Sequence, residues 1–456
     1  MYRRVMSYCI IISAITAFLA LPSHAIEFQP LGFEAASMGG AGVATAKGSF
    51  APYYNPALLP EHINGFQMSV STGVGIRELN IVDHIDTLAD IDIDENIEAV
   101  ENVAFDLLMI AALVADGTAD AQLGDPEPTA RDIATIKQEI RSLASFNGVQ
   151  IMPSLSVGMQ VGNFGLGVYG ISEGTAYAVI DPDYLDIIVG DANSAVPFIE
   201  YDEQTDLLIV SDQNAYEASS LQYALEEGID YLKITGLAYM EIPVAYGHKF
   251  TTYDWGDINC GASFKLMPGY TYDQRIDLDT ASGDLEDEMT DAQNSDMSWG
   301  IDLGVLYKPK AVPKLSLGLV AKNINTPKFE TATGDHFKVN PQVRFGCAYD
   351  FWGDRITMAL DMDLTANETF IPGYDSQMIG GGINFHPFSW ISLRAGAMSN
   401  MKESVEGTVL TGGLSIGVKW LQIDLAGQYA TKQGEFDGNS IPKYSKVQFA
   451  LVSKWF

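Results

Sequence analysis

Basic residues are scarce in this chain of 456 residues. It has 26 Lys and Arg against 59 Asp and Glu, which gives a formal charge of −33. A polyanion of this kind repels a phosphate backbone, so the composition excludes nucleic acid as a partner. Charged residues make up only 19% of the chain, whereas aromatic residues reach 11% and Gly numbers 43. This mixture favours a β-rich chain that faces something other than water.

Long apolar runs and cysteines are scarce as well. No apolar run after residue 25 approaches the ~20 residues that a spanning helix requires, which excludes a helical membrane protein. The three cysteines are Cys9, Cys260 and Cys347, and they form no CxxC motif and no cluster with His. The sequence therefore predicts no disulfide framework, no metal or redox site and no cofactor.

The first 25 residues have the pattern of a signal peptide. Arg3 and Arg4 precede an apolar stretch over 9–21, and residues 23–25 place small side chains at the −3 and −1 positions of a cleavage site. An uncleaved membrane anchor is the alternative, but the apolar stretch is short and ends at Pro22. We therefore expect a signal peptide over 1–25 and export from the cytoplasm.

Segments with a period of two dominate the chain from Asn64 onward. In the segment 355–366, Met358 and Leu360 share the apolar face, and Asp361 and Asp363 lie on the opposite face. A soluble sandwich also alternates, so one such strand does not discriminate. The repetition and the length of the segments favour a transmembrane barrel, whose strands run ~9–11 residues with apolar faces outward.

Fourteen such segments can be counted, and the connections between them alternate between short and long. The segments lie near 64–78, 148–161, 164–179, 233–250, 256–273, 297–308, 313–324, 338–350, 355–366, 376–386, 390–399, 408–418, 420–430 and 444–456. Short turns at one rim and long loops at the other are typical of outer-membrane barrels. We therefore predict an all-β fold, a 14-stranded antiparallel transmembrane barrel over 63–456, with both termini on the periplasmic side.

Several motifs carry a resemblance to a known family. The runs 38–44 (MGGAGVA) and 53–57 (YYNPA) resemble the N-terminal signature of the FadL-type transporters of long-chain fatty acids and hydrocarbons. The runs 318–327, 361–367 and 390–396 look like the FadL-related family labelled conjugal transfer protein TraF. The resemblance is to the outer-membrane barrel that carries the TraF label. The chain does not resemble the thioredoxin-like protein that is also called TraF.

The resemblance implies a plug, or hatch, over residues 26–62 inside the lumen. Asn55 can satisfy backbone groups of such a plug, and Pro56 fixes a turn. The motif can equally serve only the folding of the plug, without any gating. The candidate plug and gating residues are Gly39, Gly40, Gly42, Asn55, Pro56 and Ala57.

The third strand is the place where FadL-type barrels are thought to release ligand sideways through a kink. In this chain Gly170, Glu173 and Gly174 lie there and form the candidate lateral opening. Glycine inside a strand often marks a bulge or a bend. Curvature of the strand without an opening is the alternative.

Charged residues on the polar faces are expected inside the lumen. Mixed charges facing inward can pair across a narrow barrel and hold a plug. Asp361 and Asp363 lie two residues apart, but no His, Ser or Cys nucleophile lies near them on the same face, so we expect no enzyme. The predicted network comprises Glu241, Asp302, Arg344, Asp361, Asp363, Arg394 and Asp424.

Two long inserts, 79–147 and 180–232, are expected to carry helices outside the barrel. Residues 96–116, 128–145 and 214–232 have helical patterns. Such helices can bind a hydrophobic ligand, or they can simply pack together over the mouth of the barrel. The loop 274–296 holds eight acids against Arg275. It lacks the EF-hand spacing, so we expect a solvated acidic loop rather than a Ca²⁺ site.

Two functions of different classes fit these expectations. The first is passive uptake of hydrophobic small molecules, of the fatty acid or hydrocarbon class, past a plug and out through a lateral exit. The second is a non-transporting barrel that scaffolds a secretion or conjugation-related envelope assembly. The inward charges favour this second function, because a path for hydrophobic ligands requires an apolar lining. Both place the chain in the outer membrane of a Gram-negative bacterium, in contact with lipid. The outer-membrane assembly machinery is a further expected partner, since the chain ends in Phe456, the familiar assembly signal of such barrels.

Overall fold

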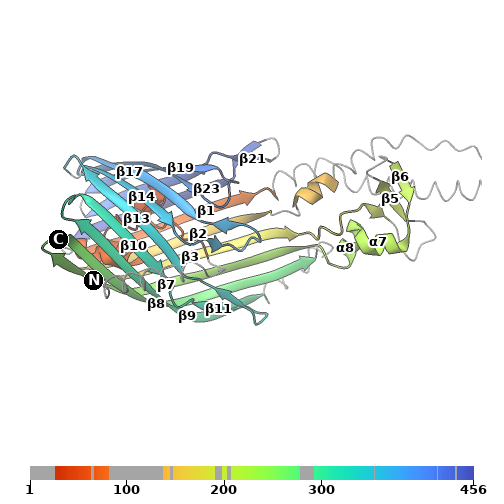
Figure 1. The fold of residues 1–456 in the computed structure, drawn as a ribbon, viewed down its shortest axis with the longest axis horizontal. Coiled ribbons are helices and arrows are strands. Elements are labelled where there is room, and N and C mark those ends of the chain that lie inside the picture. The colour runs from red at the N-terminus through yellow and green to blue at the C-terminus, as the bar shows by residue number, and fades with distance from the viewer. Residues whose placement is uncertain are drawn as a thin grey trace, which may run out of the picture.

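Fourteen strands form one closed barrel (Figure 1), which confirms the predicted fold class and strand count. The computed structural model describes residues 26–62, 66–81, 137–143, 147–189, 198–202, 207–277, 292–353, 355–418, 420–436 and 439–455. All neighbouring strands are antiparallel, and β1 closes the barrel against β23 with Phe66 opposite Trp455. The barrel strands are β1 (Phe66–Leu79), β2 (Gly148–Val161), β3 (Phe164–Val179), β7 (Tyr231–Thr252), β8 (Gly256–Asp277), β9 (Gln293–Pro309), β10 (Leu315–Lys322), β13 (Gln342–Phe351), β14 (Ile356–Asp363), β17 (Met378–Phe388), β18 (Ile391–Asn400), β19 (Thr408–Val418), β20 (Leu421–Ala430) and β23 (Tyr444–Trp455).

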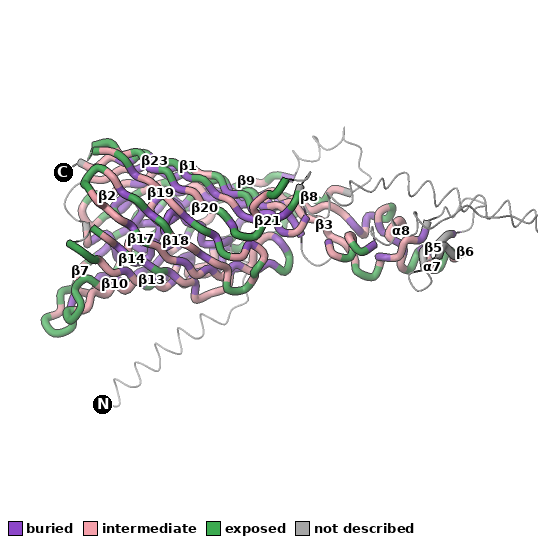
Figure 2. Tube along the Cα trace, turned by 90° about the horizontal axis from the view of Figure 1, so that it is seen from above, coloured by how far each residue is buried: buried purple, intermediate pink, exposed green. Residues whose placement is uncertain are grey.

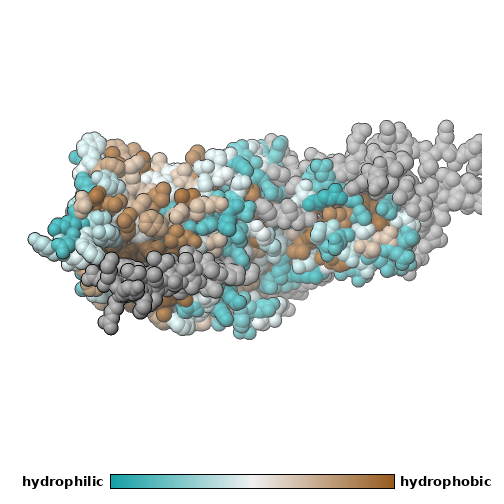
Figure 3. All heavy atoms as spheres, in the orientation of Figure 1, coloured by the Kyte–Doolittle hydropathy of each residue, from teal (hydrophilic) through white to brown (hydrophobic). Residues whose placement is uncertain are grey.

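The alternation in the sequence decides which side chains face outward. On β14, Met358 and Leu360 are exposed on the outer surface, whereas Ala359 and Asp361 are buried in the lumen. Buried and exposed residues alternate along the strands in Figure 2. Apolar side chains gather over the left half of the barrel in Figure 3, and polar ones gather toward the opposite end. A closed barrel with an apolar exterior satisfies its backbone groups internally, as lipid demands.

The two rims differ as the connection lengths predict. Short turns such as Gly162-Asn163, between β2 and β3, lie at the left end in Figure 1. The longer connections at the other end carry three small hairpins that the sequence analysis did not predict. These are β11 (Lys328–Glu330) with β12 (His336–Lys338), β15 (Asn367–Glu368) with β16 (Asp375–Ser376), and β21 (Gln433–Phe436) with β22 (Asn439–Pro442).

An extension stands beyond the long-loop rim between β3 and β7 (Figure 1). It contains a small sheet of β4 (Ile188–Val189), β5 (Ile199–Asp202) and β6 (Leu207–Val210), followed by α7 (Gln213–Ser219) and α8 (Leu221–Glu226). The helix predicted over 214–232 is therefore two short helices, and only its continuity and its end at 232 are wrong. Ser220 has extended backbone angles that end α7, its hydroxyl caps α8, and β7 already begins at Tyr231.

The other predicted helices are only partly covered by the structure. Residues 137–143 are helical, within the predicted 128–145, whereas 96–116 lies outside the described residues. The predicted signal peptide over 1–25, most of the acidic loop and Phe456 also lie outside them. Within the described part of the chain, no helix is long and apolar enough to cross a membrane.

Residues 26–62, which we call the lumenal segment, lie inside the barrel. The segment consists of short elements, α2 (Phe33–Ser37), η1 (Gly48–Phe50), α3 (Ala51–Tyr54) and η2 (Pro56–His62). Its aromatic core joins Phe28, Tyr53 and Tyr54, with ring centroids 5.1 to 5.8 Å apart. α2 packs against β18, β19, β20 and β23, and η2 packs against β7, β8 and β9. The segment therefore contacts opposite parts of the barrel wall and fills the lumen between them.

Candidate functional site

The glycine-rich run of the lumenal segment is held by the barrel wall. A carboxylate oxygen of Asp361 accepts hydrogen bonds from the backbone N–H groups of Gly42 and Val43, at 2.8 and 2.9 Å. The N–H of Gly39 donates to the hydroxyl of Thr411 at 2.9 Å. Gly39 has a φ of +66°, and a Cβ there would lie 2.3 Å from the carbonyl oxygen of Ala397, so only glycine fits. The N–H groups of Gly39 and Gly42 therefore face protein rather than a ligand.

Asn55 ties two parts of the lumenal segment to the wall. Its amide nitrogen donates to the carbonyl oxygens of Val43 and Val305, at 3.0 and 3.2 Å, and its amide oxygen accepts from Ala57 at 3.0 Å. Pro56 packs closely on Gly261. A Cβ added to Gly261 would lie 2.3 Å from the carbonyl carbon of Pro56. These contacts anchor the lumenal segment to the barrel wall.

Four fully buried charges form one group in the lumen. The ammonium of Lys265 lies 2.7 Å from Glu241 and 3.0 Å from Asp302, and Lys322 lies 3.2 Å from the second oxygen of Glu241. Their side chains are at most 2% exposed, so each charge requires a partner. Lys322 is absent from the predicted network, although the alternation of β10 places it inward.

Two further groups contain the remaining predicted lumen charges other than Asp361, which binds the lumenal segment. Arg344 binds both oxygens of Asp363, at 2.5 and 3.0 Å, and its guanidinium lies 4.1 Å from the ring centroid of Phe28. Arg394 donates to Ser415 at 2.6 Å and lies 4.0 Å from Asp424. The predicted network is therefore divided into three groups, each of which contacts the lumenal segment or the wall beside it.

The carboxylate pair Asp361 and Asp363 has structural partners. One binds backbone N–H groups of the lumenal segment and the other binds Arg344. Among the described residues, no group of three or more His, Cys, Asp or Glu side chains is arranged to hold a metal ion. Cys260 and Cys347 are free thiols.

A buried junction around Arg77 was missed by the sequence analysis. Arg77 on β1 lies 2.8 Å from Glu27 of the lumenal segment and 2.7 Å from Glu406 of the long-loop rim. It also donates to Gln150 at 2.5 Å, and Gln150 donates to Glu173 at 2.5 Å. The alternation along β1 places Arg77 on the inner face of the strand, and this pattern could have identified it from the sequence. The junction connects the start of the lumenal segment to the predicted lateral opening.

The predicted lateral opening coincides with a gap in the ladder between β2 and β3. Ile151 pairs with Gly174, and Ser154 pairs with Ile171, but the intervening Pro153 and Ser172 do not pair. Proline lacks the N–H that such a ladder requires, so Pro153 causes the gap together with its neighbours, rather than the glycines. Gln29 of the lumenal segment donates to the carbonyl oxygen of Ser172 at 3.3 Å. Gly170 itself pairs with Leu155 in the regular register.

Similar gaps continue through the next two strand pairs. The β3–β7 ladder is interrupted opposite Pro243, and the β7–β8 ladder is interrupted opposite Pro268. In each case the register is the same on both sides of the gap. The strands therefore stay side by side while the wall loses hydrogen bonds in three successive places.

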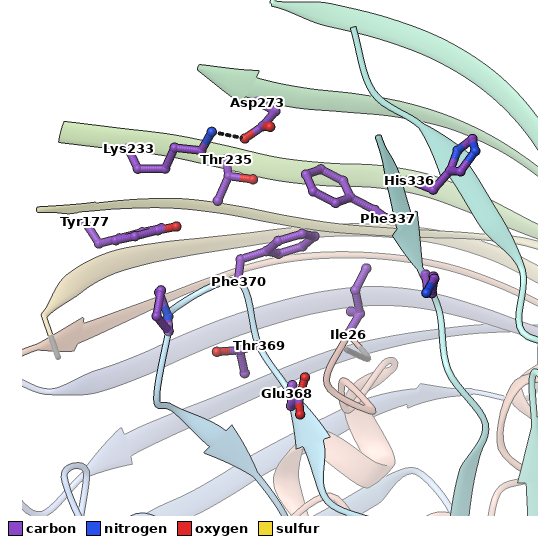
Figure 4. Close-up of a pocket in the computed structure, with 12 residues that line it drawn as sticks. Ile26, Tyr177, Lys233, Thr235, Asp273, His336, Phe337, Glu368, Thr369 and Phe370 are labelled. Carbon is purple, nitrogen blue, oxygen red and sulfur yellow. Dashed lines mark ion pairs between the residues drawn. The ribbon is translucent and has the colours of Figure 1, made fainter. Parts of the chain in front are cut away.

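A cavity of about 410 Å³ opens at the long-loop end of the lumen, and we call it the mouth cavity. Phe337 and Phe370 point toward one another in it, with ring centroids 4.9 Å apart (Figure 4). Lys233 and Asp273 form an ion pair of 2.6 Å at its edge. Its lining also includes Ile26, Tyr177, Thr235, His336, Lys338, Glu368, Thr369 and Pro372. The cavity combines an apolar body with a few charged groups, as small-molecule sites commonly do.

A second hollow of about 430 Å³, which we call the wall groove, lies at the gap between β2 and β3. It is lined by outward-facing Ile151 and Tyr270 and by inward-facing Glu173 and Thr175. Thr235 lines both the wall groove and the mouth cavity. The two hollows therefore share a lining residue on β7.

A closed fourteen-strand antiparallel barrel with an apolar exterior and a filled lumen is the architecture of a transmembrane β-barrel. Residues 52–363 match the family described as "F plasmid transfer operon, TraF, protein". The chain belongs to this family, as the motifs in the sequence predicted.

Solved structures with similar folds include two toluene transporters. TbuX of Ralstonia pickettii is 13% identical, with a TM-score of 0.46 and coverage of 94% of this chain and 99% of that one. TodX of Pseudomonas putida is 13% identical, with a TM-score of 0.44 and coverage of 95% and 99%. A FadL homologue of Pseudomonas aeruginosa is 8% identical, with a TM-score of 0.43 and coverage of 95% and 98%. A search of curated protein sequences returned no match.

Proposed function

We propose that this chain is a passive outer-membrane channel for hydrophobic small molecules of the fatty acid or hydrocarbon class. The molecule enters the mouth cavity, passes the start of the lumenal segment, which acts as a plug, and leaves sideways through the wall groove. The signal peptide exports the chain, and the barrel lies in the outer membrane of a Gram-negative bacterium with its short turns in the periplasm.

The observation that carries this proposal is the lining residue that the two hollows share. Thr235 lines both the mouth cavity and the wall groove, so a molecule in one lies next to the other. The wall near Thr235 lacks ladder hydrogen bonds at Pro153 and Ser172, which lowers the free-energy cost of separating β2 from β3. The lumenal segment blocks a straight path through the barrel, because it is anchored by Asn55, Gly39 and Gly42.

The small residues of the wall groove make the sideways path possible. A Cβ built on Gly174 meets no atom within 4 Å, so this position leaves open space at the outer surface. Replacing Gly170 and Gly174 together by Val should favour the pleated strand, and the Gly174→Val change should fill the groove. Uptake of radiolabelled decane into cells that produce the chain should then fall, while heat-modifiable migration on gels stays unchanged.

Gly427→Val is the matched control. Gly427 also lies inside a barrel strand with no atom within 4 Å of a built Cβ, but it lies on β20, away from the groove. It should leave uptake as in the wild type. Unaltered uptake in the folded Gly170→Val, Gly174→Val variant would contradict the lateral exit. No uptake by the wild type above that of cells lacking the chain would contradict the channel.

A scaffold in a secretion or conjugation-related envelope assembly is the second candidate. The extension beyond the rim favours it, because its own buried cluster of Ile188, Phe198 and Tyr216 forms a separate projecting body. The family description, which refers to a plasmid transfer operon, agrees with this reading. Deleting the extension should abolish envelope assembly in the scaffold reading and leave decane uptake intact in the channel reading.

A further inference from the structure

We propose that the lateral path discriminates among hydrophobic molecules by their head group, and that it favours those with a hydroxyl, such as long-chain alcohols or phenols, over alkanes and over ionised fatty acids. This inference rests on the proposed channel function and names the ligand chemistry of the wall groove. The selecting groups are Glu173 and Thr175, which lie two residues apart on the inner face of β3.

Both side chains present buried polar atoms that lack a protein hydrogen bond. Oε2 of Glu173 and the hydroxyl of Thr175 have no hydrogen-bond partner among the described residues, although the residues are only 1% and 2% exposed. The other oxygen of Glu173 accepts from Gln150, and the backbone N–H of Phe370 lies near the same carboxyl group. Buried polar atoms normally have partners, so these two are poised for a group that arrives with the ligand.

The position of these atoms is what connects them to transport. Glu173 and Thr175 both line the wall groove, and Thr235, which lines the groove and the mouth cavity, pairs with Thr175 across β3 and β7. The surrounding lining combines apolar and glycine positions, such as Ile151 and Gly174, with uncharged polar side chains, such as Thr271. A ligand with an apolar body and one polar head therefore matches the groove.

The charge around Glu173 argues against an anionic head. Arg77 is already paired with Glu27 and Glu406, and it reaches Glu173 only through Gln150. Lys446 is another buried cation of this region, and it reaches the side chain of Gln29 at 3.5 Å. Glu173 forms no ion pair with a cation among the described residues. A carboxylate head group would therefore enter a desolvated place without a cation to pair with, which is costly.

A hydroxyl group suits this site for a chemical reason. It donates one hydrogen bond and accepts others, so it can donate to the carboxyl oxygen of Glu173 and accept from the hydroxyl of Thr175. An alkane would leave both atoms unpaired, and leaving buried groups unpaired is a strong source of discrimination. The geometry therefore favours an alcohol over an alkane of the same length.

The test compares radiolabelled decane, decanol and decanoate in cells that produce the chain, with uptake by cells lacking it subtracted. The wild type should take up decanol about fivefold faster than decane, and decanoate at least about tenfold more slowly than decanol. Thr175→Val, which keeps the shape but removes the hydroxyl, should bring the decanol-to-decane ratio close to one. Glu173→Gln should raise decanoate uptake several-fold, because it removes the carboxyl group but keeps its shape.

Thr357→Val is the control for the hydroxyl deletion, because Thr357 is buried on β14 and does not line the groove. It should change none of the three rates, and all variants are compared only if their heat-modifiable migration is normal. Equal uptake of decane and decanol, or ratios that Thr175→Val and Glu173→Gln leave unchanged, would overturn the selectivity while the channel stands. No uptake of any of the three molecules would overturn the channel itself.

Discussion

The guanidinium of Arg77 lies 2.8 Å from the carboxylate of Glu27, and both side chains are at most 3% exposed. Arg77 comes from the first barrel strand and Glu27 from the start of the lumenal segment, so this pair joins the lumenal segment to the wall. The same guanidinium reaches Glu406 at 2.7 Å. One cation thus holds two carboxylates that lie far apart in the sequence.

We predict that Arg77→Met lowers the free energy of unfolding by about 3 to 5 kcal/mol, because it leaves two buried carboxylates without their cation. The measurement is urea unfolding of the purified barrel in lipid vesicles, followed by heat-modifiable migration. Adding Glu27→Gln to Arg77→Met should recover part of the loss. Equal stability of wild type and Arg77→Met would show that the junction contributes nothing.

The contact between Asn55 and Gly304 supports a second prediction. A Cβ on Gly304 would lie 1.9 Å from the amide oxygen of Asn55. Gly304→Ala should therefore cost about 1 to 3 kcal/mol through overpacking, and Asn55→Ala a similar amount through lost hydrogen bonds. The double variant should cost less than the sum of the two, because the new methyl group occupies the vacated space. Strict additivity in the same urea assay would contradict this contact.

Glu61 should make stability depend on pH. Burial raises the pKa of its carboxyl group, but hydrogen bonds from Lys308 and Asn259 and the nearby charges outweigh burial and lower the pKa overall. A lowered pKa in the folded state means that the carboxylate contributes stability above its unfolded pKa of about 4.3. That contribution is lost as the pH falls through the lower folded value.

Glu61→Gln should therefore destabilise the barrel at pH 7 more than at pH 3, as measured by urea unfolding at both values. Glu330→Gln, at an exposed carboxylate of the β11 hairpin, is the control and should have the same small effect at both. An effect of Glu61→Gln that does not change with pH would contradict the argument.

The topology can be tested with single thiols. In a background of Cys260→Ala and Cys347→Ala, a cysteine replaces either Asp212 in the extension or Asp254 in the turn between β7 and β8, both of which are exposed. A membrane-impermeant maleimide added to intact cells should label the first and reach the second only after lysis. Labelling of the turn in intact cells would invert the proposed orientation.

Strand positions and facing were determined by the sequence itself. The period of two in segments such as 355–366 places Met358 toward lipid and Asp361 toward the lumen, and β14 has that arrangement. In a barrel that spans a membrane, lipid and lumen impose opposite polarity on alternate residues, so a local pattern is enough. The count of fourteen and the contrast between the two rims follow from the same pattern and the loop lengths.

Only the tertiary structure decided which lumen groups meet. Asp361 binds the backbone of Gly42, 319 positions away, and Arg77 binds Glu406, 329 positions away. Such pairs depend on how the barrel closes and on the path of the lumenal segment, which no local periodicity records. The gap at Pro153 illustrates the same limit, because its effect depends on the partner strand that register places beside it. The local alternation of polar and apolar residues determined which side chains form each face of the barrel wall. The closure of the barrel determined which residues meet in the lumen.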